Sequence, residues 1–276
     1  MDVFLALEPA DRRALPARYL EELRARDGEP DLRAHEFTNR EPSFEALAER
    51  PVRWQGPAPV DQALFDRFLP RGCADDPAAS ARALGALDRA TLWALCTAKV
   101  NRAERFGVAY GVERHGFTAV SERDPFAYIE IEEIYHTRIL CEALAVLGIR
   151  MELPPPGPVT LDPGEALRPP GFSELLVLCG ELVGLSVFRL LVDEARRLFG
   201  EEASPLARLE ALFAQILVDE GGHVLFLRSR LDQPELGLSR RALPAVAAAL
   251  LTDLPELSLL FGRARITAAL ARLVTA

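Results

Sequence analysis

Two segments of the sequence each carry a glutamate and a histidine three residues apart inside an otherwise apolar stretch. The first is EEIYH, with Glu133 and His136, and the second is DEGGH, with Glu220 and His223. Residues i and i+3 project from one face of an α-helix, so each pair can present a carboxylate and an imidazole to one metal ion. The repeated pairing therefore indicates a metal site that is built from two helices.

Four long segments with helical periodicity must position these residues. They cover residues 87–111, 124–148, 172–200 and 204–231. Asp124, Ser173 and Ser204 are plausible N-caps, while Gly148 and Gly200 are typical helix stops. Strand-like alternation is scarce along the chain, so the sequence predicts an all-α fold.

The connections predict how the four helices are arranged. The first and second helices, and the third and fourth, have short links and should form antiparallel hairpins. The proline-rich stretch 149–171 is long enough, at about 3.1 Å per residue when extended, to run the full length of the bundle. The second and third helices should therefore be parallel, which gives a ferritin-like four-helix bundle with one long crossover.

The bundle is expected over residues 88–231, within a single compact domain. Residues 1–87 are broken by prolines and predict a helical and irregular segment that wraps the bundle. Residues 232–276 predict further helices that pack on it. We find no chemical motif in residues 1–87.

Register selects the remaining ligands, because residues at one height in an antiparallel hairpin lie equally far from its turn. Glu104 lies about as far before the first turn as Glu133 lies after it, and Glu181 matches Glu220 across the second turn. Glu113, Glu174 and Glu194 lie at other heights and are rejected. The predicted ligand set of a dinuclear site is Glu104, Glu133, His136, Glu181, Glu220 and His223.

Two further carboxylates, Glu132 and Asp219, directly precede the motif glutamates. Ligating histidines usually donate their second ring N–H to a carboxylate. We expect Asp219 to hold His136 and Glu132 to hold His223 across the bundle; the alternative is ordinary helix charge. Tyr135 lies one residue off the ligand face. We expect it to serve in packing, and the alternative is a hydrogen-bonding or redox tyrosine.

Composition limits the class of protein. The chain has 276 residues, of which 49% are apolar, and a net charge of −9. An acidic chain is a poor partner for nucleic-acid phosphates. No apolar run approaches about 18 residues, so no membrane span is expected.

The cysteines and the first residues bear on location. Cys73, Cys96, Cys141 and Cys179 are scattered without CxxC spacing and predict reduced thiols. The N-terminus lacks the basic and apolar regions of a signal peptide. A cytoplasmic protein is expected.

These motifs resemble the ferritin-like di-iron carboxylate superfamily over residues 88–231. EEIYH and DEGGH match its two Glu-x-x-His motifs in order, and Glu104 and Glu181 match its single-glutamate helices. Within the oxygenase branch, VDEGGHVLFL is most similar to the p-aminobenzoate N-oxygenase-like proteins. Those proteins carry a further histidine ligand where this chain has Ile216, so a six-ligand site is expected here.

The resemblance implies two iron ions, or an iron–manganese pair, that activate O₂. It implies an oxidoreductase that hydroxylates, desaturates or N-oxygenates a small or carrier-bound organic substrate, with electrons from a reductase. Beyond the metal ligands no catalytic residue is expected. A substrate pocket would be lined by Cys96, Val100, Leu185 and Phe188. The apolar terminal helices suggest a homodimer.

Two other functions stay open. A ferroxidase or iron-storage protein would use the same ligands without an organic substrate, but the long additions on both sides of the bundle would obstruct the packing of a cage. A scaffold with a vestigial site is disfavoured by the complete ligand set.

Overall fold

The computed structural model describes residues 2–31, 36–40, 44–70, 82–115, 125–151 and 172–275. Within these ranges the protein is all-α, with ten helices and a single antiparallel pair of two-residue strands, Pro30–Asp31 (β1) and Glu36–Phe37 (β2). The predicted fold class is thus confirmed at the level of secondary structure.

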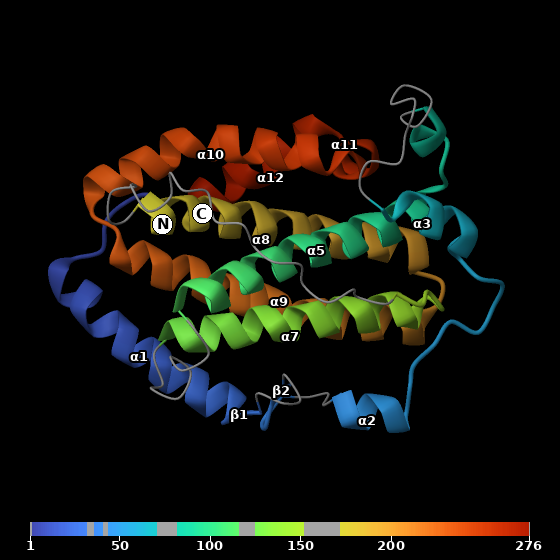
Figure 1. The fold of residues 1–276 in the computed structure, drawn as a ribbon, viewed down its shortest axis with the longest axis horizontal. Helices are drawn as coiled ribbons and strands as arrows, with labels where there is room; N and C mark the ends of the chain where they lie inside the picture. The colour runs from blue at the N-terminus through green and yellow to red at the C-terminus, as the bar shows by residue number, and fades with distance from the viewer. Residues whose placement is uncertain are drawn as a thin grey trace.

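Four long helices form the centre of the molecule. They are α5 (Arg89–His115), α7 (Pro125–Val146), α8 (Phe172–Phe199) and α9 (Ala203–Arg230). Helix α5 packs on α7, α7 on α9, α9 on α8, and α8 on α5, which closes a ring of neighbours around a shared core (Figure 1). Each helix lies within a few residues of a segment predicted from periodicity.

Neighbouring helices in this ring run in opposite directions. On α7 and α9, Tyr135 contacts Gln215, whereas Glu132, one turn earlier on α7, contacts His223 further along α9. Figure 1 shows the same reversal between α8 and α9. Helices α7 and α8 are therefore parallel, the arrangement that two hairpins joined by a crossover require, while the crossover residues 152–171 lie outside the described residues.

Two of the predicted helix starts are wrong by one or two residues. Helix α8 already includes Ser173, and α9 begins at Ala203 with Glu202 as its N-cap, so Ser204 lies in the first turn. The preference of serine for an N-cap is too weak to fix a helix end to the residue. The stop at Gly148 is confirmed by its positive φ of 81°, and Asp124 lies outside the described residues.

The N-terminal part of the chain lies along one side of the four helices. Helix α1 (Pro9–Asp27) packs against α7 and α9, α2 (Phe44–Glu49) follows the strand pair, and α3 (Gln62–Phe68) packs against α5 (Figure 1).

The C-terminal part covers the opposite side. Helices α10 (Gln233–Asp253) and α12 (Arg263–Thr275) pack against α8, and α11 (Pro255–Phe261) packs against α5 (Figure 1). The start of α10 is set by a capping box in which Asp232 and Glu235 each bind the other's backbone N–H.

Helix α8 is buried by these neighbours. The stretch Glu174–Phe199 is long and apolar enough to cross a bilayer, although no uninterrupted apolar run of that length stands in the sequence. Of its most apolar 18 residues, 67% are buried inside the protein. Helices α10 and α11 reach the length and hydropathy of a membrane span only when they are taken together, and they are bent by 97° at their junction. Packing between α5, α9, α10 and α12 accounts for the apolar character of α8.

Candidate metal centre

The six predicted ligands converge from the four long helices. Their ligand atoms form two overlapping groups, and within each group all atoms lie within 4.8 Å of one another. The first group is Glu104, Glu133, His136 and Glu220, and the second is Glu133, Glu181, Glu220 and His223. The glutamates of the two motifs, Glu133 and Glu220, belong to both groups.

The imidazole Nδ1 atoms face these carboxylates. Nδ1 of His136 lies 3.5 Å from Glu220 Oε1 and 3.9 Å from Glu104 Oε2. Nδ1 of His223 lies 3.0 Å from Glu133 Oε1 and 3.5 Å from Glu181 Oε2. Each ring therefore turns the same nitrogen toward the carboxylates of the other helices.

The opposite nitrogen of each ring meets a carboxylate outside the cluster. Nε2 of His136 lies 2.9 Å from Asp219 Oδ2, and Nε2 of His223 lies 2.9 Å from Glu132 Oε2. These are the pairings expected from the sequence. A carboxylate can only accept a hydrogen bond, so each ring donates its Nε2–H to Asp219 or Glu132. In the neutral ring the lone pair is then on Nδ1, which is the atom that faces the cluster.

Three buried atoms in the cluster lack a hydrogen-bond partner: Nδ1 of His136, Nδ1 of His223 and Oε1 of Glu133. Unsatisfied buried polar atoms are uncommon and cost free energy in a folded protein. All three have lone pairs that point toward shared space, so a cation would satisfy them together. The buried glutamate and histidine cluster can thus hold a metal ion.

The pKa values of the clustered glutamates reflect their burial beside one another. Burial raises the pKa of Glu220 well above its ordinary value, and the carboxylates of Glu181, Glu133 and Glu104 raise it further. Burial and Glu133 likewise raise the pKa of Glu104. Burial acts in the same direction on Glu133, but its close neighbours Glu104, His136 and His223 outweigh burial and lower its pKa.

The histidines respond in the opposite sense to burial. Burial alone lowers the pKa of His136, but its hydrogen bond to Asp219 and the neighbouring carboxylates of Glu104 and Glu133 outweigh burial and raise the pKa well above 6.5. The pKa of His223 is raised in the same way by its carboxylate neighbours. Without a metal, protons therefore take the place of positive charge in the cluster.

The structure adds three charged residues that the sequence did not point to. Arg26 at the end of α1 and Arg40 after β2 form ion pairs with the outer carboxylates Glu132 and Asp219. Asp27 pairs with both of these arginines. The prediction that the N-terminal segment is a wrapping element without chemistry is therefore incomplete. Such contacts join residues that are far apart in the chain, so they cannot be predicted from the local spacing of residues in the sequence.

Tyr19 on α1 also reaches the centre. A Cβ added to Gly222 would lie 2.6 Å from the Tyr19 hydroxyl, so the glycine beside His223 makes room for this ring. Burial, and the nearby charge of Glu132, raise the pKa of Tyr19. Tyr135 is fully buried and donates a hydrogen bond to Gln215 at 3.0 Å, so packing and hydrogen bonding are combined there.

The rejected glutamates are accounted for elsewhere. Glu194 is buried at the far end of α8, where Arg89, Arg197 and Arg265 surround it. Glu174 lies 3.9 Å from Arg230 near the start of α8. The structure does not describe the side chains of Glu113 and His115. It also does not describe the residues His35 and Cys73.

The residues expected to line a substrate pocket are core residues between α5 and α8. Cys96, Val100, Leu185 and Phe188 are each no more than 5% exposed. Their role toward a substrate stays a prediction. Cys96 and Cys179 are buried thiols, and Cys141 is partly buried and accepts a hydrogen bond from the side-chain amide of Asn101.

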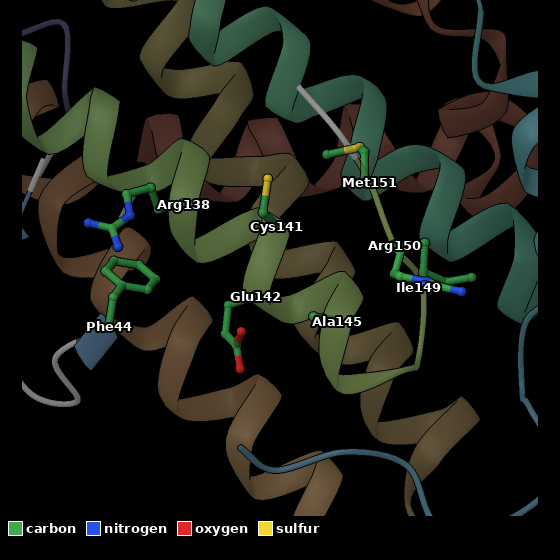
Figure 2. Close-up of a pocket in the computed structure, with 8 residues that line it drawn as sticks. All are labelled: Phe44, Arg138, Cys141, Glu142, Ala145, Ile149, Arg150 and Met151. Atoms are coloured by element: carbon green, nitrogen blue, oxygen red, sulfur yellow. The ribbon is translucent and has the colours of Figure 1, made fainter. Parts of the chain in front are cut away.

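A groove of about 500 Å³ lies elsewhere, along the second half of α7 (Figure 2). It is lined by Phe44, Arg138, Cys141, Glu142, Ala145, Ile149, Arg150 and Met151. The Arg138 guanidinium stacks on the ring of Phe44 at 3.9 Å, and Glu142 pairs with Arg53 at 2.7 Å. None of the six candidate ligands lines this groove.

Comparison with protein-family models, with curated proteins and with solved structures finds no match to this chain. We therefore infer the function from the geometry of the centre.

Proposed function

We propose that the protein is an O₂-dependent oxidoreductase with a dinuclear iron centre in a ferritin-like bundle. Its substrate would be a small or carrier-bound organic molecule that is hydroxylated, desaturated or N-oxygenated. The observation that carries the proposal is the sharing of Glu133 and Glu220 between two otherwise separate groups of ligands.

The shared glutamates favour two ions over one. Each group on its own offers three carboxylates and one imidazole, and each imidazole comes from a different helix. Two Glu-x-x-His helices and two single-glutamate helices are the arrangement that di-iron and di-manganese carboxylate bundles use. A donor set of several carboxylates with one imidazole per group is better suited to iron or manganese than to zinc, which favours a closed tetrahedral set of ligands.

The protein's own part in such a reaction is positioning and exclusion of water. When bound, the ions would supply Lewis acidity and electron transfer to O₂. Glu104 and His136 would hold one ion and Glu181 and His223 the other, while Glu133 and Glu220 belong to both ligand groups. Asp219 and Glu132 hold the outer nitrogens of the two histidines, which are fully buried, so the rings keep one orientation.

Iron uptake and oxygen consumption separate this proposal from iron storage. The protein would be loaded with Fe(II) without air, freed of excess iron and given O₂ with a chemical reductant. An oxygenase should retain about two irons per chain, remain a small oligomer and consume O₂ in repeated turnovers only when an organic substrate is present. Continued iron uptake by a large assembly would instead support storage, and the oxygenase proposal would fail.

A further inference from the structure

We propose that Arg40 is a positioning residue of the metal centre, through which the N-terminal segment (residues 9–40) fixes both histidines at once. This inference rests on the proposed metal-binding function. It concerns a part of the chain that lies outside the four long helices and that carries no motif of its own.

One guanidinium group joins the two carboxylates that hold the histidines. Arg40 forms a fork on Asp219, with Nη1 donating to Oδ2 at 2.5 Å and Nη2 donating to Oδ1 at 2.8 Å. The same Nη2 donates to Glu132 Oε1 at 2.9 Å. Asp219 and Glu132 bind Nε2 of the two imidazoles, so a shift of Arg40 would move both rings.

Arg40 is itself held firmly. It donates to Oδ1 and Oδ2 of Asp27 at 3.1 and 3.0 Å, and its side chain is only 5% exposed. Its guanidinium lies 4.8 Å from the ring centroids of both Phe37 and Tyr135. This combination of a planar fork and stacking on rings is available to arginine and not to lysine.

Charge explains why the outer carboxylates need this arginine. Asp27, Glu132 and Asp219 bring three carboxylates together in a buried volume, and Arg26 and Arg40 bring two guanidinium groups. Arg26 also reaches Glu132 and Asp219, at 2.5 and 2.8 Å, but its side chain is 36% exposed. Arg40 is the buried partner, and removing it leaves like charges facing each other in a region of low dielectric.

A positioning role differs from a purely structural one in what it changes. Loss of a structural contact lowers stability but leaves the coordination of a bound ion unchanged. Loss of a positioning contact alters ligand orientation, and thus metal affinity and the ligand field. Arg53 offers a control, because it ties a later part of the N-terminal region, beyond residue 40, to Glu142 on α7 at 2.7 Å and takes no part in the centre.

The test is titration of the metal-free full chain with Co(II), followed through its visible ligand-field bands. Arg40→Gln should weaken Co(II) binding by about 10–100-fold and change the band pattern. Arg53→Gln should keep the wild-type affinity and bands. Arg40→Lys keeps the charge without the fork, so it should fold and fall between wild type and Arg40→Gln.

Several outcomes would overturn the inference. Wild-type affinity and bands in Arg40→Gln would do so, and if that variant does not fold, wild-type behaviour of Arg40→Lys has the same meaning. Equal loss in Arg53→Gln would show that general docking of the N-terminal region on the bundle is responsible. A wild-type chain that binds no Co(II) would remove the proposed function as well, which separates the two failures.

Discussion

Asp219 Oδ2 lies 2.9 Å from Nε2 of His136, so a carboxylate on α9 fixes an imidazole on α7. The mirror pairing of Glu132 with His223 makes the same link in the opposite direction. The two helices that carry the Glu-x-x-His motifs thus orient each other's histidines. This reciprocal arrangement makes the centre a property of the packed bundle and not of either helix alone.

Replacing Asp219 by asparagine should weaken metal binding by about 10–100-fold. The amide loses the charge that favours Nε2–H on His136, and it can present an N–H that selects the wrong ring tautomer. Isothermal titration with Mn(II) would measure the change. Asp193→Asn, at a half-exposed position on α8, is the control and should bind as wild type does.

Metal binding should release protons and strengthen as the pH rises. The pKa values of Glu104, Glu220, His136 and His223 are all raised, so these groups keep their protons to a higher pH than free carboxyl and imidazole groups do, and a cation must displace those protons. Titration in weakly buffered solution with a pH indicator would count the protons. Affinity that is constant between about pH 6 and 8 would contradict the assignment of these groups as ligands.

The metal-free protein should lose stability as the pH rises. Groups with raised pKa values bind protons more tightly when folded, so their stabilisation is complete below their ordinary values, 4.5 for Glu220 and 6.5 for His136. It is then lost as the pH rises through their raised folded-state values. Thermal unfolding across pH should show a falling Tm in metal-free protein. Saturating Mn(II) should reverse this slope, since a bound cation stabilises the deprotonated ligands.

Gly222→Ala should destabilise the protein by about 1–3 kcal/mol, because the added methyl group overpacks a buried site. The new Cβ would lie 2.6 Å from the hydroxyl of Tyr19, whose ring is stacked on Phe226. Gly221→Ala is the matched control on the same helix, where an added Cβ meets nothing within 4 Å. Urea unfolding should show a neutral or stabilising effect there; equal losses in both variants would argue against the close contact.

Lys99→Met should destabilise the fold by about 3–5 kcal/mol, because it leaves a buried carboxylate without its cation. Lys99 on α5 pairs with Glu256 on α11, and both side chains are nearly inaccessible. The double variant Lys99→Met with Glu256→Leu should recover most of the loss. Denaturant unfolding of the three proteins would decide, and a cost below about 1 kcal/mol for the single variant would show that the pair is solvated.

The sequence predicts the six clustered residues because the bundle has simple geometry. Helical periodicity gives the long helices, and equal distance from a turn places Glu104 beside Glu133 and Glu181 beside Glu220. The i, i+3 spacing then aligns each histidine with its glutamate. Glu194 fails the same register test, and the structure places it in a separate arginine cluster.

The arginines around the centre could not be predicted in this way. Arg40 follows a short irregular stretch, and its partner Asp219 is 179 residues away in the chain. Which arginine of an irregular segment reaches the bundle depends on how that segment folds back, and neither periodicity nor spacing describes such a path. Only Gly222 indicates such a contact in the sequence, and only weakly. Glycine inside a helix lowers the stability of the fold, so its presence there suggests that another group packs closely against the backbone.

The central claim is that the six clustered residues bind two metal ions, and metal content per chain tests it most directly. Protein from iron-supplemented cells should contain about two irons per chain. Glu104→Ala and His223→Ala should lose most of that iron, whereas Glu174→Ala, on α8 with Glu181 but outside the cluster, should retain it. A folded wild-type chain without stoichiometric metal would contradict the account.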